Sequence, residues 1–455
     1  MSRRAFRYRD TTPGTVLGVV AAMLVLRLPL SFLLFVVAPW FLILTGAIAK
    51  GGSVRCLPLK AMLGWCLVAA TISIAVLHPG VAASTGNNVV IMIAVIGCTL
   101  VVHRGQAPGL TARRTLAGLY WGAGGVWLIA MGEMITGIKL LPILYPDANT
   151  VSYVQSSRFI VSATYPNIND FSVVLVMLVT AVVARMWFDR ARGWRNAGRW
   201  LVLLTSLFMV VMSTSRGALV GCLAGVALLI VLNVRRLHPH ALGVRAGLFG
   251  GGLIVFVGAV FFTSSYVQDH STATRGQIFN NAMSMLAGSP ADALLGYGSL
   301  ASYQSAAKAA FGDVLMDPHN MLLEITLNYG VIALVLFIVV WLWVLMRGFL
   351  PRRPMADWQT AFGLTTVVLL PLLGVVPSST LRYHVTWIYL AATTLLVAEG
   401  AEARTPTRPE LSDEQPSGRE LSGSDTSGAT AADGDLGHAH DDHARDQAEH
   451  HSDHR

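Results

Sequence analysis

The sequence predicts an all-α, polytopic integral membrane protein of about 12 transmembrane helices with one large extracytoplasmic loop. The composition, the apolar runs and the placement of basic residues each support this. Of the 455 residues, 54% are hydrophobic and only 13% are charged, whereas soluble domains carry about 25% charged residues. A chain this apolar requires lipid as part of its solvent.

Twelve apolar runs supply the predicted helices. Most are long enough to cross about 30 Å of hydrocarbon at a rise of about 1.5 Å per residue. The first is short and is followed by Arg27-Leu28-Pro29, so it could instead form half of a broken helix. The runs are 14–26, 28–49, 61–78, 88–103, 115–137, 170–188, 200–214, 217–233, 246–263, 321–346, 359–376 and 385–398.

The number of basic residues is high in one predicted loop and low in the next along the chain. With residues 1–13 placed in the cytoplasm, twenty Lys and Arg residues fall in inner segments and six in outer ones. Cytoplasmic loops of membrane proteins carry this excess, so both termini are expected inside a bacterial inner (plasma) membrane. The six outer residues are Lys139, Arg158, Arg216, Arg275, Lys308 and Arg382.

The chain divides into a transmembrane domain, 14–398, and a cytoplasmic tail, 399–455. The tail is acidic, His-rich and poor in large apolar residues, which predicts disorder; its histidine tract could bind transition metals weakly. The domain has two long outer loops, 138–169 and 264–320. Within the second, Gly276–Ala287 is expected to lie as a helix on the membrane surface, because its apolar positions have helical spacing: Ile278, Phe279, Met283 and Leu286.

The sequence lacks the motifs that are typical of several classes of function. The net charge is +17 over residues 1–398 and −9 over the tail, and the basic excess fits membrane topology, so no nucleic-acid partner is expected. The four cysteines form no C-x-x-C pair. No P-loop, no G-x-S-x-G, no H-E-x-x-H and no outer D-x-D pair occurs. No cofactor and no metal site is therefore predicted.

Polar residues cluster at predicted outer helix ends. Ser213-Thr214-Ser215-Arg216-Gly217-Ala218 joins two helices, and the planar guanidinium of Arg216 could hold phosphate oxygens, aided by the hydroxyls of Ser213 and Ser215. Taken alone, this stretch is explained better by a polar turn with an arginine that reaches to lipid headgroups.

A second polar stretch, Asp317-Pro318-His319-Asn320-Met321-Leu322-Leu323-Glu324, opens a long helix. A neutral His319 could take a proton from a hydroxyl, and Glu324, one turn deeper, could orient it or the acceptor. The alternative is a capping Asn320 beside an interfacial histidine. A third stretch, Tyr165–Asp170, is interpreted as a turn with Asn169 or Asp170 as the N-cap.

These motifs, in this order, resemble the O-antigen ligase and O-antigen polymerase family. The resemblance rests on STSRGA, on TRGQIFNNAMSMLAGSPADALLGYG in the large loop, on PHNMLLEITLNYGVIAL, and on YPNINDFS, where Tyr165 stands in place of a common Asn. By motif it covers roughly residues 150–350.

The resemblance implies a metal-independent, GT-C-like glycosyltransferase of cell-surface polysaccharide biosynthesis. Such enzymes transfer a glycan from undecaprenyl diphosphate at the outer leaflet to an acceptor hydroxyl. That acceptor is lipid A–core of lipopolysaccharide for a ligase and a lipid-linked glycan for a polymerase. Arg216 would bind the diphosphate, His319 would act as base or orient the acceptor, and Arg158 and Arg275 would be secondary phosphate contacts, with Ser213, Ser215, Asn320 and Glu324 as further candidates.

Two other classes stay open at this point. One is a membrane transporter or channel for a small anion, because twelve helices is a common transporter number; against it, no internal repeat relates the two halves. The other is a non-catalytic scaffold for polysaccharide assembly. An outer site shared by Arg216 and His319 favours the enzyme, whereas a continuous path lined by them favours transport. The motifs do not separate a ligase from a polymerase.

Overall fold

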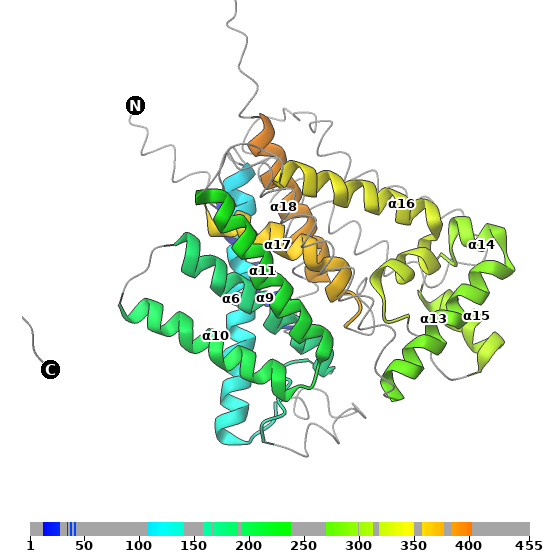
Figure 1. Ribbon diagram of the computed structural model, residues 1–455, viewed down its shortest axis with the longest axis horizontal. Helices are drawn as coiled ribbons and strands as arrows, with labels where there is room; N and C mark the ends of the chain where they lie inside the picture. Colours follow the sequence, from blue (N-terminus) through cyan, green and yellow to red (C-terminus); the bar gives the residue numbers. More distant parts are fainter. Residues whose placement is uncertain are drawn as a thin grey trace, which may run out of the picture. The chain divides into compact units, whose positions relative to one another are not determined.

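A computed structural model describes the chain in segments, and these are helical, with no strand among them (Figure 1). Four predicted runs, 61–78, 88–103, 246–263 and most of 28–49, lie outside the described residues, as do Asp317, Arg382 and the tail beyond residue 402. The described residues are 12–27, 34, 37–38, 41, 108–140, 158–165, 167–189, 193–237, 270–298, 300–312, 318–349, 357–376 and 384–402.

The other eight predicted runs coincide with helices. Four described helices, α6, α9, α11 and α16, contain segments long and apolar enough to cross a membrane. The described part of the chain is therefore helical with four candidate membrane spans, which agrees with the predicted fold class, while the total of twelve helices stays a prediction. The eight are α2 (Thr12–Val25), α6 (Pro108–Thr136), α9 (Ile168–Phe188), α10 (Trp194–Met212), α11 (Arg216–Leu237), α16 (Met321–Phe349), α17 (Trp358–Leu373) and α18 (His384–Glu402).

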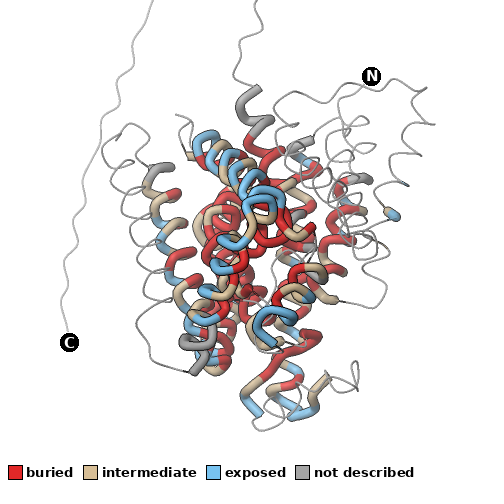
Figure 2. Tube along the Cα trace, turned by 90° about the vertical axis from the view of Figure 1, so that its right-hand side faces the viewer, coloured by how far each residue is buried: buried red, intermediate tan, exposed pale blue. Residues whose placement is uncertain are grey.

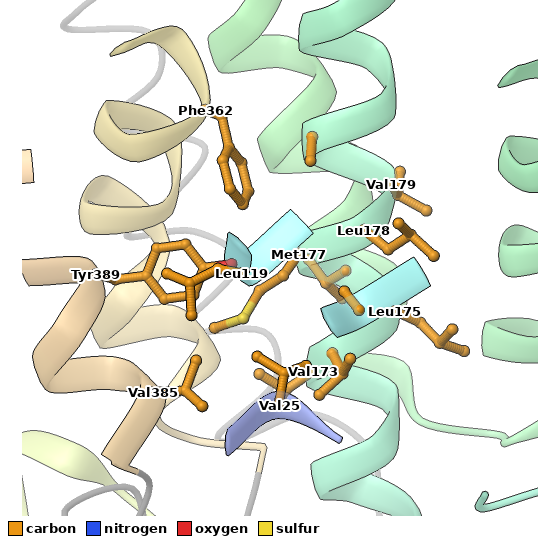
Figure 3. Packing of buried hydrophobic residues seen from close by; sticks show 14 of the residues in the cluster. Val25, Leu119, Val173, Leu175, Met177, Leu178, Val179, Phe362, Val385 and Tyr389 are labelled. Carbon is orange, nitrogen blue, oxygen red and sulfur yellow. The ribbon is translucent and has the colours of Figure 1, made fainter. Parts of the chain in front are cut away.

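Helix α9 occupies the centre of the main apolar core. It is apolar around its whole circumference, which is typical of a helix buried on all sides. Figure 3 shows Met177 of α9 extending toward Leu119 of α6 and Tyr389 of α18, and Val173 of α9 beside Val25 of α2. Figure 2 shows that the buried residues gather in the middle of the helices, with exposed residues on their outward sides. The core thus fixes the ends of these helices relative to one another.

Close helix contacts depend on glycines spaced four residues apart. Gly14 and Gly18 of α2 face α6, where a Cβ added to Gly118 would lie 2.5 Å from the Cα of Gly18. Gly118 is followed by Gly122, which faces Ala22 of α2 in the same way. Small residues at this spacing let membrane helices approach closely and pack backbone against backbone.

Three further helices, α13 (His270–Gly288), α14 (Pro290–Leu295) and α15 (Leu300–Phe311), make their main contacts with one another and with α16 (Figure 1). They share a small core with the beginning of α16, made of Ala282, Met285, Tyr303, Ala307, Leu323 and Leu327. The helix predicted over Gly276–Ala287 lies within α13, but its apolar residues do not share one exposed side, and its position on the membrane surface stays a prediction. Ile278 is buried and Leu286 packs against the small core, whereas Phe279 and Met283 are exposed.

Helix α16 coincides with the predicted run 321–346, but it is broken at Gly330, which the sequence did not predict. Gly330 has φ 82° and ψ 173°. A Cβ there would overlap the carbonyl of Leu294 and lie 2.6 Å from the nitrogen of Leu295. The result is a first segment, residues 321–329, and a second segment, residues 331–349, which is about 28 Å long at 1.5 Å per residue.

The loop after α14 closes this break with two hydrogen bonds. The backbone N–H of Tyr297 donates to the carbonyl of Leu327 (2.7 Å), and that of Gly298 donates to the carbonyl of Asn328 (2.8 Å). Carbonyls at the end of a helix have no partner within the helix, and the G-x-G sequence supplies donors for them. Gly296, at φ 73°, allows the close approach.

We expect Gly330→Ala to destabilise the protein more than an alanine substitution at a nearby glycine that has open space around it. A side chain in that backbone region costs roughly 1–3 kcal/mol, and the overlap with α14 adds to it. The thermal midpoint in detergent should fall, and proteolysis between α14 and α15 should accelerate. Gly288→Ala is the matched control, since its Cβ would meet nothing within 4 Å. Equal midpoints for the two variants would contradict the close contact.

Candidate functional site

One end of the bundle, hereafter the Arg216 end, gathers the helix termini that carry the predicted site. Here α6, α10 and α17 end, and α9, α11 and α16 begin. Direct contacts join these termini. The hydroxyls of Ser172 on α9 and Ser213 after α10 lie 2.9 Å apart, and the backbone N–H of Met321 on α16 donates to the carbonyl of Gly374 after α17 (3.0 Å).

Backbone strain concentrates at this end. Among the described residues, the non-glycine residues with positive φ are Arg27 (52°), Ala163 (51°), Thr214 (53°) and His319 (46°). Each lies in a junction at the Arg216 end. Such conformations cost about 1–3 kcal/mol and persist where the surrounding structure over-determines them, often at functional sites.

The turn before α11 presents Arg216. Arg216 is the first residue of the helix and is exposed, whereas Ser213 and Ser215 are buried. The Ser213 hydroxyl donates to the carbonyl of Val210 (2.7 Å), and its oxygen accepts from the backbone N–H of Ser215 (3.4 Å). Ser213 therefore holds the turn together. The positive end of the α11 dipole adds to the attraction of Arg216 for an anion.

The segment before α16 presents His319. The side chain is half-exposed, and its left-handed backbone places it at the corner where loop becomes helix. Asn320 is the N-cap of α16: its Oδ1 accepts from the backbone N–H groups of Leu322 (2.9 Å) and Leu323 (3.2 Å). Glu324 is almost completely buried one turn deeper. The cap therefore fixes the backbone that follows the histidine.

The end of α17 brings the Arg216 and His319 segments together, although 103 residues separate them in the sequence. A Cβ on Gly217 would lie 2.7 Å from a methyl of Val376. Val376 follows Gly374, whose carbonyl accepts from Met321, two residues after His319. Both functional segments thus pack against the same few residues after α17.

Arg158 packs against the end of α6, and Arg275 lies within α13. The Arg158 Nε donates to the carbonyl of Met134 (2.7 Å), and its guanidinium also donates to the carbonyl of Ile135. A cation at this position stabilises the C-terminus of α6. Arg275 lies within α13, and its side chain is outside the described residues.

A buried carboxylate, Glu133, holds the connection between α6 and α9, and sequence reasoning assigned it no role. It accepts hydrogen bonds from the backbone N–H groups of Leu140 (2.7 Å), Ser162 (3.3 Å) and Ala163 (3.0 Å). Burial lowers the pKa of Lys139, while the nearby charge of Glu133 opposes that shift. Three donors converging on one carboxylate fix the chain that leads into α9.

The sequence analysis also did not predict the ion pair between Arg27 and Asp170, because it expected Asp170 only as a possible helix cap. The actual N-cap of α9 is Asn167, whose side chain accepts from the backbone N–H of Asn169 (2.8 Å). An Arg27 guanidinium nitrogen lies 3.8 Å from the Asp170 carboxylate, and the guanidinium carbon lies 4.9 Å from the ring centroid of Tyr165. The Tyr165 hydroxyl donates to the carbonyl of Val25. These contacts join the end of α2 to the start of α9.

The Arg27–Asp170 pair should contribute to stability more than the Arg113–Asp357 pair on the same bundle. Its side chains are 34% and 10% exposed, against 41% and 26% for the control pair. Exposed pairs are worth about 0.2–1 kcal/mol, whereas losing one partner of a buried pair costs several-fold more. A double-mutant cycle with Arg27→Gln and Asp170→Asn should give a coupling energy above about 1 kcal/mol. A coupling no larger than that of the control cycle would contradict this role.

No group of three or more His, Cys, Asp or Glu side chains that could hold a metal ion occurs within the described residues. The chemistry that the described site offers is a guanidinium with a helix N-terminus for an anion, and an imidazole for a proton.

Comparison with known families identifies the central part of the chain. Residues 201–338 match the model of the O-antigen ligase family. The match contains Arg216, Arg275, His319, Asn320 and Glu324, and it ends within the second segment of α16. No curated protein matches the chain. The family match supports a role in joining or polymerising polysaccharide. Residues 201–338 are therefore similar to the O-antigen ligase family, and the match covers less than half of the chain.

Proposed function

We propose that the protein transfers a glycan from undecaprenyl diphosphate to an acceptor hydroxyl at the Arg216 end, with that end facing the outer leaflet. The main support is that Arg216 and His319, both within the family match, stand on segments packed against the same residues after α17. The outward orientation follows from the distribution of basic residues, with both termini cytoplasmic.

The reaction needs two functions from the protein. The acceptor oxygen attacks the anomeric carbon, the bond from that carbon to the diphosphate oxygen breaks, and the diphosphate leaves with the electron pair. Arg216 neutralises the charge that develops on the leaving diphosphate, while His319 takes the proton of the acceptor hydroxyl. The donor is already activated by its diphosphate, so neither ATP nor a metal ion is required.

The other candidates support these two residues. Arg275 is proposed as a second phosphate contact from α13. Ser213 and Asn320 act through the backbone, as the turn and cap hydrogen bonds indicate, and the buried Ser215 belongs to the same turn. Glu324 orients the His319 segment from below. Arg158 stabilises the end of α6 and reaches phosphate only if a substrate displaces one of its carbonyl partners.

A lipid-linked glycan profile of a deletion strain tests this function and separates its two forms. Accumulated single repeat units on undecaprenyl diphosphate would identify a polymerase, and accumulated long chains would identify a ligase. A plasmid carrying the intact gene should restore the normal profile. An unchanged profile in the deletion strain, under conditions in which the gene is expressed, would contradict a transfer function.

A further inference from the structure

The second segment of α16 exposes a continuous apolar stripe along its length. The exposed residues recur every three or four positions, and the opposite side packs against α17. In a membrane-spanning helix such a stripe faces lipid hydrocarbon. Its members are Val331, Ile332, Val335, Val339, Leu342 and Met346.

Helix α14 stands at the outer end of this stripe. Its last residues lie directly against Gly330, because a Cβ on that glycine would overlap the carbonyl of Leu294. The side chains of Leu294 and Leu295 are 52% and 39% exposed, and Val331 and Ile332, which follow the glycine, are 40% and 43% exposed. We call these four residues the Leu294 face. Val331 and Ile332 also belong to the apolar stripe of α16, and Leu294 and Leu295 add to it from α14, whose backbone lies against Gly330.

The sequence of α14 changes from polar to apolar along its axis. It begins at the N-cap Ser289, whose hydroxyl oxygen accepts from the backbone N–H of Asp292 (3.2 Å). It ends at Leu294 and Leu295, next to the membrane-spanning segment. A helix with a polar start and an apolar end fits a crossing of the membrane interface, where its polar end remains in the headgroup region.

We propose that α14 inserts its Leu294–Leu295 end into the hydrocarbon of the outer leaflet that surrounds α16. The Leu294 face is then a lipid-binding surface. The occupant is acyl chain, because the face is continuous with the lipid-facing stripe of the span and carries no charged side chain. This inference depends on α16 crossing the membrane and not on glycan transfer.

The insertion has a consequence for the site. The loop after α14 donates two hydrogen bonds to the last carbonyls of the first α16 segment, and that segment begins next to His319. Lipid contact at α14 is therefore connected to the His319 segment through the first segment of α16.

Site-directed spin labelling measures the depth of α14 directly. Leu294→Cys, Leu295→Cys, Val335→Cys and Ala310→Cys would each be made in a full-length chain without its four native cysteines and labelled with a nitroxide. The labelled proteins would be reconstituted into phosphatidylcholine–phosphatidylglycerol vesicles. Val335 is the lipid-facing reference, and Ala310, exposed on α15, is the matched control. Power saturation would compare accessibility to oxygen with accessibility to a water-soluble nickel chelate.

The labels at Leu294 and Leu295 should be more accessible to oxygen than to nickel, as at Val335, and the label at Ala310 should show the reverse. Values at both leucines like those at Ala310 would overturn the proposal. Low accessibility to both reagents together with dipolar broadening between labels would also overturn it, since a second copy of the chain would then cover the face. Two label positions guard against misfolding of one variant, which the elution profile in detergent would reveal.

Discussion

Replacing Arg216 by lysine should reduce the rate of glycan transfer by roughly 10²-fold, although the positive charge is kept. Removing one well-placed group that stabilises transition-state charge costs about 10²–10³-fold, and lysine cannot make the planar, two-bond contact of a guanidinium with phosphate oxygens. The turn that presents Arg216 is held by Ser213 and Ser172, so a lysine at this position cannot shift its backbone to compensate. The initial rate in reconstituted vesicles measures the effect.

Arg195→Lys is the matched control for this substitution. Arg195 is exposed on α10, at the opposite end of that helix from the Ser213 turn, and its guanidinium lies over the ring of Trp194. This variant should retain the wild-type rate. If Arg216→Lys transferred glycan as fast as Arg195→Lys, Arg216 would be an anchor to lipid headgroups and not a ligand of the diphosphate.

Replacing His319 should produce the second large loss, about 10²–10⁴-fold, which is the usual contribution of a general base. Asparagine is the informative substitution, because it tolerates the left-handed backbone of this position (φ 46°) and cannot take the proton. His319→Ala should lose similar activity and some stability as well. Equal thermal midpoints of His319→Asn and the wild type would show that the loss is chemical.

The pH dependence gives an independent check on the histidine. A base must be neutral to accept a proton, so the wild-type rate should fall as the pH drops through the pKa of the histidine. The residual rate of His319→Asn should lack this acidic limb. An acidic limb of the same shape in the variant would assign the titration to another group, and the proton of the acceptor would then leave by another route.

Many of the helices were predictable because a membrane-spanning helix requires a long and continuous run of apolar residues. Runs such as 170–188 and 217–233 match α9 and α11 to within a few residues. The site segments around Arg216 and His319 were also predictable, because a polar stretch at a helix end in an apolar chain is conspicuous. The Asn320 cap followed the usual preference for Asn at this position.

The features that could not be predicted from the sequence depend on contacts between segments that are far apart in the chain. The break at Gly330 lies within a run that is apolar on both sides, and only the approach of α14 reveals it. The partners of Glu133 are backbone N–H groups, which leave no mark in the sequence. Arg27 and Asp170 are 143 residues apart, so only their opposite charges at two helix ends could have suggested the pair.

Metal-independent glycan transfer is tested most directly with the purified full-length protein in vesicles, with an undecaprenyl-diphosphate-linked glycan as donor and EDTA in the buffer. Transfer to an acceptor hydroxyl should proceed with release of undecaprenyl diphosphate in equal amount, and Arg216→Lys and His319→Asn should each abolish most of it. Donor that stays intact with every acceptor offered, or transfer that EDTA stops and manganese restores, would contradict the proposed metal-independent transfer at the Arg216 end.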